Sequence, residues 1–180
     1  MYDMRKTSSM RNGLVELINF IPLDKFNMVE IGSYAGESAD MFASSPKIAS
    51  IWCVDPWQAG YDSTDPASST NFLEVESAFD EVMKKHQDKI SKFKGIANQF
   101  IESHPKFIPD FVYIDANHTY EGCKDDILTT LKWKGKGLKF IGGHDYASWC
   151  PGVIKAVDEI FGKPDRTFSD SSWIVELANG

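Results

Sequence analysis

The sequence has few cysteines and no long apolar run. Its three cysteines, Cys53, Cys123 and Cys150, are odd in number and widely spaced, which fits reduced thiols in a cytoplasmic protein better than a disulfide framework. No segment approaches the roughly 20 apolar residues that cross a membrane. The first residues also lack the apolar stretch of a secretion signal. We therefore expect a cytoplasmic protein without a membrane partner.

The sequence also has fewer basic than acidic residues. The chain carries 19 Lys and Arg against 26 Asp and Glu, for a formal charge of -7, so it has no general basic field that would gather phosphate groups. We therefore expect no nucleic-acid partner. The 180 residues are 42% hydrophobic, enough for a sizeable core, and we expect one domain spanning residues 1–180.

Short apolar runs rich in Val, Ile and Phe alternate with longer segments of helical spacing, a pattern typical of α/β proteins. The sequence predicts strands at residues 27–34, 48–57, 90–97, 110–116, 138–146, 166–170 and 171–178. It predicts helices at residues 13–21, 36–45, 72–86, 98–105, 121–133 and 151–162. We expect a doubly wound, mostly parallel seven-stranded sheet that ends in an antiparallel hairpin. Residues 58–71, polar and Pro-bearing, are predicted to be a surface loop on the acceptor side of a site.

Each of the first five predicted strands ends in a polar or glycine-containing cluster. In chain order these clusters read "EIGSYAGES", "DPW", "GIAN", "DANH" and "GGHDY". Turns alone need Gly, Asn and Asp, but turn chemistry explains one or two such clusters rather than five. In parallel sheets ligands bind beyond the carboxyl ends of the strands, so the sequence predicts a shared site there.

Four segments carry a resemblance to a known family. The motifs "VEIGSYAGESA", "CVDPW", "YIDANHTYEGCKDDI" and "GGHDY" resemble those of class I S-adenosylmethionine-dependent methyltransferases, in particular a small Rossmann-like group with a similar fourth strand. The resemblance covers nearly the whole chain and implies S-adenosylmethionine as the cofactor. It also implies transfer of a methyl group to a small polar molecule, such as the hydroxyl of a sugar.

The first motif is expected to hold the methionine end of that cofactor. Gly32 and Gly36 let the backbone approach closely because they lack a Cβ atom. By resemblance, Glu30 orients the amino-acid end, directly or through water, and Ser33 or Ser38 adds hydroxyl contacts. The glycine spacing departs from the G-x-G-x-x-G fingerprint of dinucleotide-binding proteins.

The following strands are expected to hold the nucleoside. Asp55 ends the second strand, where it can accept hydrogen bonds from both ribose hydroxyls, although an aspartate before Pro56 is also typical of a turn. Trp57 either flanks ribose and adenine or belongs to the core. By resemblance, Ala97 lies against adenine and Asp115 completes the cofactor set.

Acceptor chemistry is expected from Asp115, His118, His144 and Asp145. A hydroxyl nucleophile must be aligned with the sulfonium methyl group and must lose its proton. His118 or His144 could take that proton as a general base, because the reference pKa of histidine is near 6.5. Of the two, we favour His118.

A divalent metal ion is the second way to activate the acceptor. Asp115 and Asp145 could share such an ion, as in related metal-dependent O-methyltransferases. Where those enzymes carry further acids or an amide, this sequence has Asn117 and His144, a departure that disfavours magnesium and tolerates a softer ion. The spacing of its His and Cys residues does not match a structural zinc site.

Two other function classes stay open at this point. One is a nicotinamide-dependent oxidoreductase, which the glycine spacing disfavours. The other is a module that binds S-adenosylmethionine without turnover. On the fifth predicted helix, Asp125 and Asp126 are expected on the solvent face, with Asp125 the only one for which the resemblance leaves a role.

Overall fold

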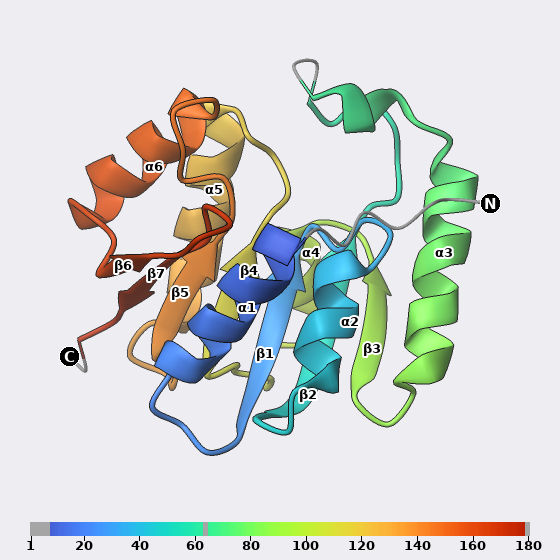
Figure 1. Ribbon diagram of the computed structural model, residues 1–180, viewed down its shortest axis with the longest axis horizontal. Helices are drawn as coiled ribbons and strands as arrows, with labels where there is room; N and C mark the ends of the chain where they lie inside the picture. The colour runs from blue at the N-terminus through green and yellow to red at the C-terminus, as the bar shows by residue number, and fades with distance from the viewer. Residues whose placement is uncertain (1–7, 63–64, 179–180) are drawn as a thin grey trace.

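The computed structural model describes residues 8–62 and 65–178, and Figure 1 shows a central twisted sheet with helices on both faces. The strands are β1 Phe26–Ile31, β2 Ile48–Asp55, β3 Ile90–Lys94, β4 Phe111–Ile114, β5 Phe140–Gly143, β6 Arg166–Thr167 and β7 Trp173–Glu176. The helices are α1 Ser8–Phe20, α2 Glu37–Ser44, α3 Phe72–Lys85, α4 Ala97–Ser103, α5 Tyr120–Thr130 and α6 Pro151–Phe161. Two short 3-10 helices are η1 Pro66–Ser69 and η2 Leu131–Trp133.

The seven strands lie in the order β3-β2-β1-β4-β5-β7-β6. The pairs among β1 to β5 are parallel, whereas β7 pairs antiparallel with both β5 and β6. The strand order reverses direction at β1, which is the switch point where α/β proteins open a crevice for ligands. The predicted fold class, a mostly parallel seven-stranded sheet with a terminal antiparallel hairpin, is confirmed.

Two apolar layers cover the sheet because its central strands are buried on both faces. On one face α1, α2 and α3 pack over side chains that include Met28, Ile51 and Tyr113. On the other face α4, α5 and α6 pack over a set that includes Val29 and Val112. In Figure 1, α1 and α2 cross in front of the sheet.

The parallel register brings the carboxyl ends of four strands to one edge. Ile31 at the end of β1 pairs with Val54 of β2 and with Ile114 of β4, and Ile114 pairs with Gly143 of β5. The residues that follow these positions therefore emerge side by side. This alignment places the polar clusters predicted from the sequence around one point.

The strands end earlier than the sequence predicts, because several residues just beyond them adopt positive φ angles. Gly32 has φ 89°, Trp57 has φ 43° and Asp145 has φ 60°, and such angles cannot continue an extended strand. The terminal hairpin is likewise shorter than residues 166–178. Residues 58–71 were predicted to be a loop without regular structure, yet they include η1. Asp65 caps the start of η1, because its side chain accepts a hydrogen bond from the Ala67 amide.

Candidate active site

A cavity of about 510 Å³ opens at the carboxyl ends of the strands. Its size lies within the range of roughly 300 to 1,000 Å³ typical of small-molecule sites. The lining comes from the loops after β1, β2, β3, β4 and β5, from α5, and from the segment around η1. The cavity thus gathers all five of the polar clusters.

The turn after β1 approaches the end of β4 so closely that only glycine fits. A Cβ atom on Gly32 would lie 2.2 Å from the carbonyl oxygen of Asp115, far inside van der Waals contact. Gly36, with φ 87°, plays a different part: its missing Cβ would lie 3.2 Å from Phe79 and Val82 of α3. Gly32 lines the cavity, whereas Gly36 shapes the turn by packing against a helix.

Glu30 is fully buried and does not itself line the cavity. Its Oε1 accepts a hydrogen bond from Ser38 Oγ, but its Oε2 has no hydrogen-bond partner among the described residues. Burial raises the pKa of this carboxyl group to about 7, an effect that the neighbouring hydroxyls of Ser33 and Ser38 partly offset. A buried acceptor without a partner beside two cavity-lining serines fits a site built to receive a hydrogen-bond donor.

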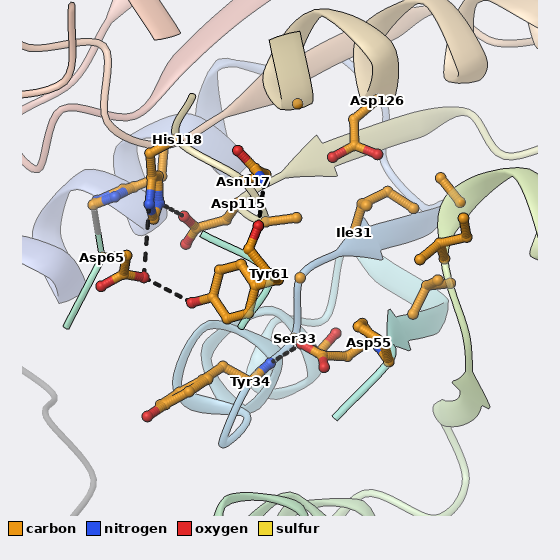
Figure 2. Close-up of a pocket in the computed structure, with 18 of the residues that line it drawn as sticks. Ile31, Ser33, Tyr34, Asp55, Tyr61, Asp65, Asp115, Asn117, His118 and Asp126 are labelled. Atoms are coloured by element: carbon orange, nitrogen blue, oxygen red, sulfur yellow. Dashed lines mark hydrogen bonds and ion pairs between the residues drawn. The ribbon is translucent and has the colours of Figure 1, made fainter. Parts of the chain in front are cut away.

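Asp55 is buried at the end of β2 and lines the cavity. Its Oδ2 accepts a hydrogen bond from Tyr34 N at 2.9 Å, and its Oδ1 accepts one from Trp57 N at 2.6 Å. Burial raises the pKa of the carboxyl group despite these two donors. Each oxygen keeps a second lone pair, so the turn geometry and a ligand contact are compatible. Figure 2 shows Asp55 facing the cavity.

Trp57 and Ala97 occupy different surroundings. Trp57 does not line the cavity; it is buried against Phe79, with ring centroids 4.8 Å apart, and donates its indole N–H to the Tyr34 carbonyl oxygen. Of the two roles considered for Trp57, the structure places it in the core. Ala97, the first residue of α4, is buried in the cavity wall next to the half-exposed Ile96.

His118 is surrounded by carboxylates at the other end of the cavity. Its Nε2 lies 3.1 Å from Asp145 Oδ2 and 3.7 Å from Asp115 Oδ1. His144 Nδ1 lies 3.2 Å from the same oxygen of Asp145. Asp115 and Asp145 raise the pKa of His118 to about 10, more than burial lowers it. Both histidines and both aspartates predicted for acceptor chemistry are therefore brought together.

These charges also set the protonation states of the cluster. Burial lowers the pKa of His144, but the charges of Asp115 and Asp145 outweigh it and raise that pKa to about 9. Burial would raise the pKa of Asp145, yet the two histidines hold it well below its ordinary value. At neutral pH both imidazoles are thus protonated and their charges are compensated by carboxylates.

Asp115, His144 and Asp145 each offer one ligand atom, and the three atoms lie within 4.8 Å of one another. No other group of this kind occurs in residues 8–62 and 65–178. Cys123 is buried in the core beside α6. A mixture of carboxylate and imidazole ligands suits zinc, manganese or iron better than it suits magnesium, which prefers oxygen ligands alone.

The described residues between β2 and α3 contact the His118 end of the cavity. Asn117 Nδ2 donates to the Tyr61 carbonyl oxygen at 2.7 Å, and the His118 amide donates to Asp62 Oδ2 at 3.1 Å. The Tyr61 hydroxyl donates to Asp65 Oδ2 at 2.7 Å, and Asp65 Oδ2 lies 3.8 Å from His118 Nδ1 (Figure 2). The sequence placed this segment near the acceptor but gave no signal for the roles of Tyr61, Asp62 and Asp65.

The solvent-face expectation for α5 was wrong for Asp126, which is half-buried, whereas Asp125 is exposed. Asp125 and Asp126 both line the cavity rather than only facing solvent. Helical spacing explains the result, because Gly122 and Asp126 lie one turn apart on the same face, whereas Cys123 and Ile127 pack into the core. Two consecutive acidic residues on a helix usually lie on its exposed face, and no local sequence pattern shows that Asp126 faces the cavity instead.

A family model described as a methyltransferase domain matches residues 29–146, well over half of the chain. The chain belongs to this methyltransferase family. This match favours a methyltransferase over the oxidoreductase alternative. The matched segment contains every residue predicted for the cofactor and for acceptor chemistry.

Solved structures show the same fold at low identity. The methyltransferase is similar to CalS11, a TDP-rhamnose 3'-O-methyltransferase of calicheamicin biosynthesis, with 14% identity, 92% of this chain and 76% of that chain covered, and a TM-score of 0.53. It is also similar to cofactor-bound Rv0187 from MTB, with 13% identity, 99% and 84% covered, and a TM-score of 0.60.

A curated relative comes from Acanthamoeba polyphaga mimivirus and is an uncharacterised protein. It is 25% identical over 149 residues, which cover 82% of this chain and 64% of the relative. The chain therefore spans slightly less than two thirds of that relative. In the part of the methyltransferase that the structure describes, no helix is both long enough and apolar enough to cross a membrane.

Proposed function

We propose that the methyltransferase transfers a methyl group to a hydroxyl of a small polar molecule, such as a sugar. One observation carries this proposal: a cradle suited to S-adenosylmethionine and the cluster of Asp115, His118, His144 and Asp145 open into a single cavity. A donor methyl group and a hydroxyl acceptor can therefore meet within one enclosed space.

The residues of the cradle fit the cofactor. We assign its methionine end to the turn after β1, where Gly32 leaves room for a close approach and Glu30 keeps an unused acceptor oxygen. Ser33 and Ser38 add hydroxyl groups on the same wall. We assign the ribose hydroxyls to Asp55, whose oxygens retain free lone pairs.

The charge of the cavity favours an acceptor without phosphate groups. Its described lining contains no lysine or arginine, and its only basic side chains are those of His118 and His144. Carboxylates of Asp65, Asp115 and Asp145 stand around them. A negative wall repels an anionic acceptor and tolerates a neutral polyol, so a small neutral molecule fits better than a nucleic acid.

Bound S-adenosylmethionine supplies an electrophilic sulfonium methyl group, and the protein must align the acceptor oxygen and remove its proton. We propose that the His118 imidazole takes this proton, while Asp145 Oδ2, 3.1 Å from Nε2, orients the ring. Because the pKa of His118 is about 10, the free histidine is mostly protonated at pH 7. A positive charge placed beside Asp115 lowers that pKa, so a loaded cavity makes His118 a more available base.

The ligand geometry supports a second way to activate the acceptor. Asp115, His144 and Asp145 would hold a divalent ion, which lowers the pKa of a bound hydroxyl. In that case His118 would stand next to the ion rather than act as the base. The two mechanisms share the same acceptor end of the cavity and differ in what removes the proton.

A methyl-release assay over a panel of sugars and other polyols tests the proposed acceptor class, with nucleotides and short RNA as comparators. Turnover of a neutral hydroxyl compound supports the proposal, and turnover of RNA alone would overturn it. Chelation then separates the two mechanisms. Full activity after extensive chelation, together with a loss of about 10² to 10⁴-fold in His118→Ala, is the result expected for a general base.

A further inference from the structure

Asp126 is a carboxyl group in the cavity wall for which the fold offers no partner. It lies on α5, its side chain is half-buried, and it lines the cavity. No described residue forms a hydrogen bond or an ion pair with it. Burial, with a smaller contribution from the charge of Asp125, raises the pKa of Asp126 to about 7. The fold thus keeps a poorly solvated acid at this point of the cavity without any structural use for it.

Asp126 lies at the end of the cavity opposite the His/Asp cluster. Figure 2 shows its carboxyl group near Ile31 and across the cavity from His118. The strand order β3-β2-β1-β4-β5 separates the loop after β3 from the His/Asp cluster after β4 and β5. A methyl group that faces the cluster requires the base of the cofactor to extend the other way, towards the β3 side.

That side of the cavity carries apolar lining residues. Ile31, Val54, Ile96 and Ala97 all line it. Ile31, Val54 and Ala97 belong to the same packed layer as Cys123 and Ile127 of α5, the helix that presents Asp126. Asp126 therefore lies beside this apolar part of the cavity (Figure 2).

We propose that Asp126 recognises the 6-amino group of adenine, an inference that rests on the proposed placement of S-adenosylmethionine in this cavity. The amino group is a hydrogen-bond donor at the edge of the ring, and an aspartate oxygen is an acceptor. Asp126 acts in this way as a residue that positions the cofactor and selects its base. It takes no part in proton transfer, which occurs at the opposite end of the cavity.

A double-mutant cycle tests the contact directly. The affinities of the wild-type protein and of Asp126→Ala are measured by calorimetry for two probes, S-adenosylhomocysteine and its analogue with purine in place of adenine. Purine carries hydrogen where adenine carries the amino group. The wild type is expected to prefer adenine by about 10- to 100-fold, the range for a hydrogen bond to a carboxylate. In Asp126→Ala the preference falls to within about twofold, which gives the coupling between the two groups.

Two further variants separate recognition from general effects of charge and packing. Asp125→Ala removes a neighbouring carboxylate from the same wall and is expected to retain the wild-type preference for adenine. Asp126→Asn keeps an acceptor oxygen and is expected to restore most of that preference. Both readouts are ratios of two affinities for one protein, so a change in stability alone does not move them.

The outcomes separate the role of Asp126 from the placement of S-adenosylmethionine in the cavity, on which that role depends. An unchanged adenine preference in Asp126→Ala, or its loss in Asp125→Ala instead, would overturn the role of Asp126 while leaving the cofactor in the cavity. If the wild type binds S-adenosylhomocysteine but shows no preference over the purine analogue, the inference is also overturned. Failure of the wild type to bind either probe would instead contradict the proposed cofactor site.

Discussion

Replacing Glu30 by glutamine should make the free methyltransferase more stable and a poorer binder of its cofactor. The pKa of Glu30 is about 7 in the folded protein, against an ordinary value of 4.5, because the carboxyl group is buried. Since the folded pKa is raised, the unfolded chain loses its proton first as the pH rises. The folded state is then penalised progressively between about pH 4.5 and 7, and fully above pH 7.

The size of this penalty follows from the shift. One pKa unit corresponds to about 1.4 kcal/mol, so the raised pKa of Glu30 lowers the unfolding free energy by about 3 kcal/mol at pH 8 and by about 1 kcal/mol at pH 5. Glutamine has nearly the same shape and cannot ionise. Glu30→Gln should therefore gain about 2 kcal/mol in unfolding free energy relative to the wild type when the pH is raised from 5 to 8.

Urea unfolding at pH 5 and pH 8 measures this difference, and calorimetry with S-adenosylmethionine measures the cost in affinity. We expect binding to weaken about tenfold or more, because the unused Oε2 is replaced by a donor. Glu16→Gln, a substitution of an exposed glutamate on α1, serves as the control and should leave both measurements unchanged. Parallel stability profiles for Glu30→Gln and the wild type would refute the reasoning.

Three further predictions concern the rest of the cavity. Asp55→Ala should weaken binding of S-adenosylmethionine by about 1 to 3 kcal/mol; unchanged affinity in a folded variant, measured by calorimetry, would remove Asp55 from the site. Hydrogen exchange in residues 58–62 should slow when cofactor and acceptor bind, and Asn117→Ala, which removes the bond to the Tyr61 carbonyl, should speed it; a segment equally protected in all states would argue against gating. If His118 is the base, kcat/KM should rise with pH towards the His118 pKa of about 10, and a pH-independent rate abolished by chelation would favour the ion.

The sequence predicts the sheet and the strand-end clusters well because both depend on local patterns. Runs such as "FVYI" are apolar throughout, which parallel strands covered on both faces require. Register then brings residues such as Asp115 and His144 together without further information. The site residues after β1, β2, β4 and β5 could therefore be named before their distances were known.

Other features depend on contacts between distant segments and leave no local pattern. Asp62 meets the His118 amide across 56 positions of the chain, and nothing in the polar loop sets that aspartate apart. Trp57 and Asp126 were each judged from immediate neighbours, yet tertiary packing decides that the tryptophan lies in the core and that the acid faces the cavity. The raised pKa of His118 likewise comes from Asp115 and Asp145 together.

The contact between Gly32 and the Asp115 carbonyl has a consequence for how new acceptor preferences can arise. Because main chain meets main chain there, the distance between the turn after β1 and the end of β4 is fixed by the backbone and cannot be adjusted by changing side chains. Variation that alters acceptor choice should therefore accumulate in the segment between β2 and α3, where Tyr61 and Asp65 reach the cavity from a surface loop. Libraries aimed at new acceptors would best diversify those loop positions and leave the strand ends untouched.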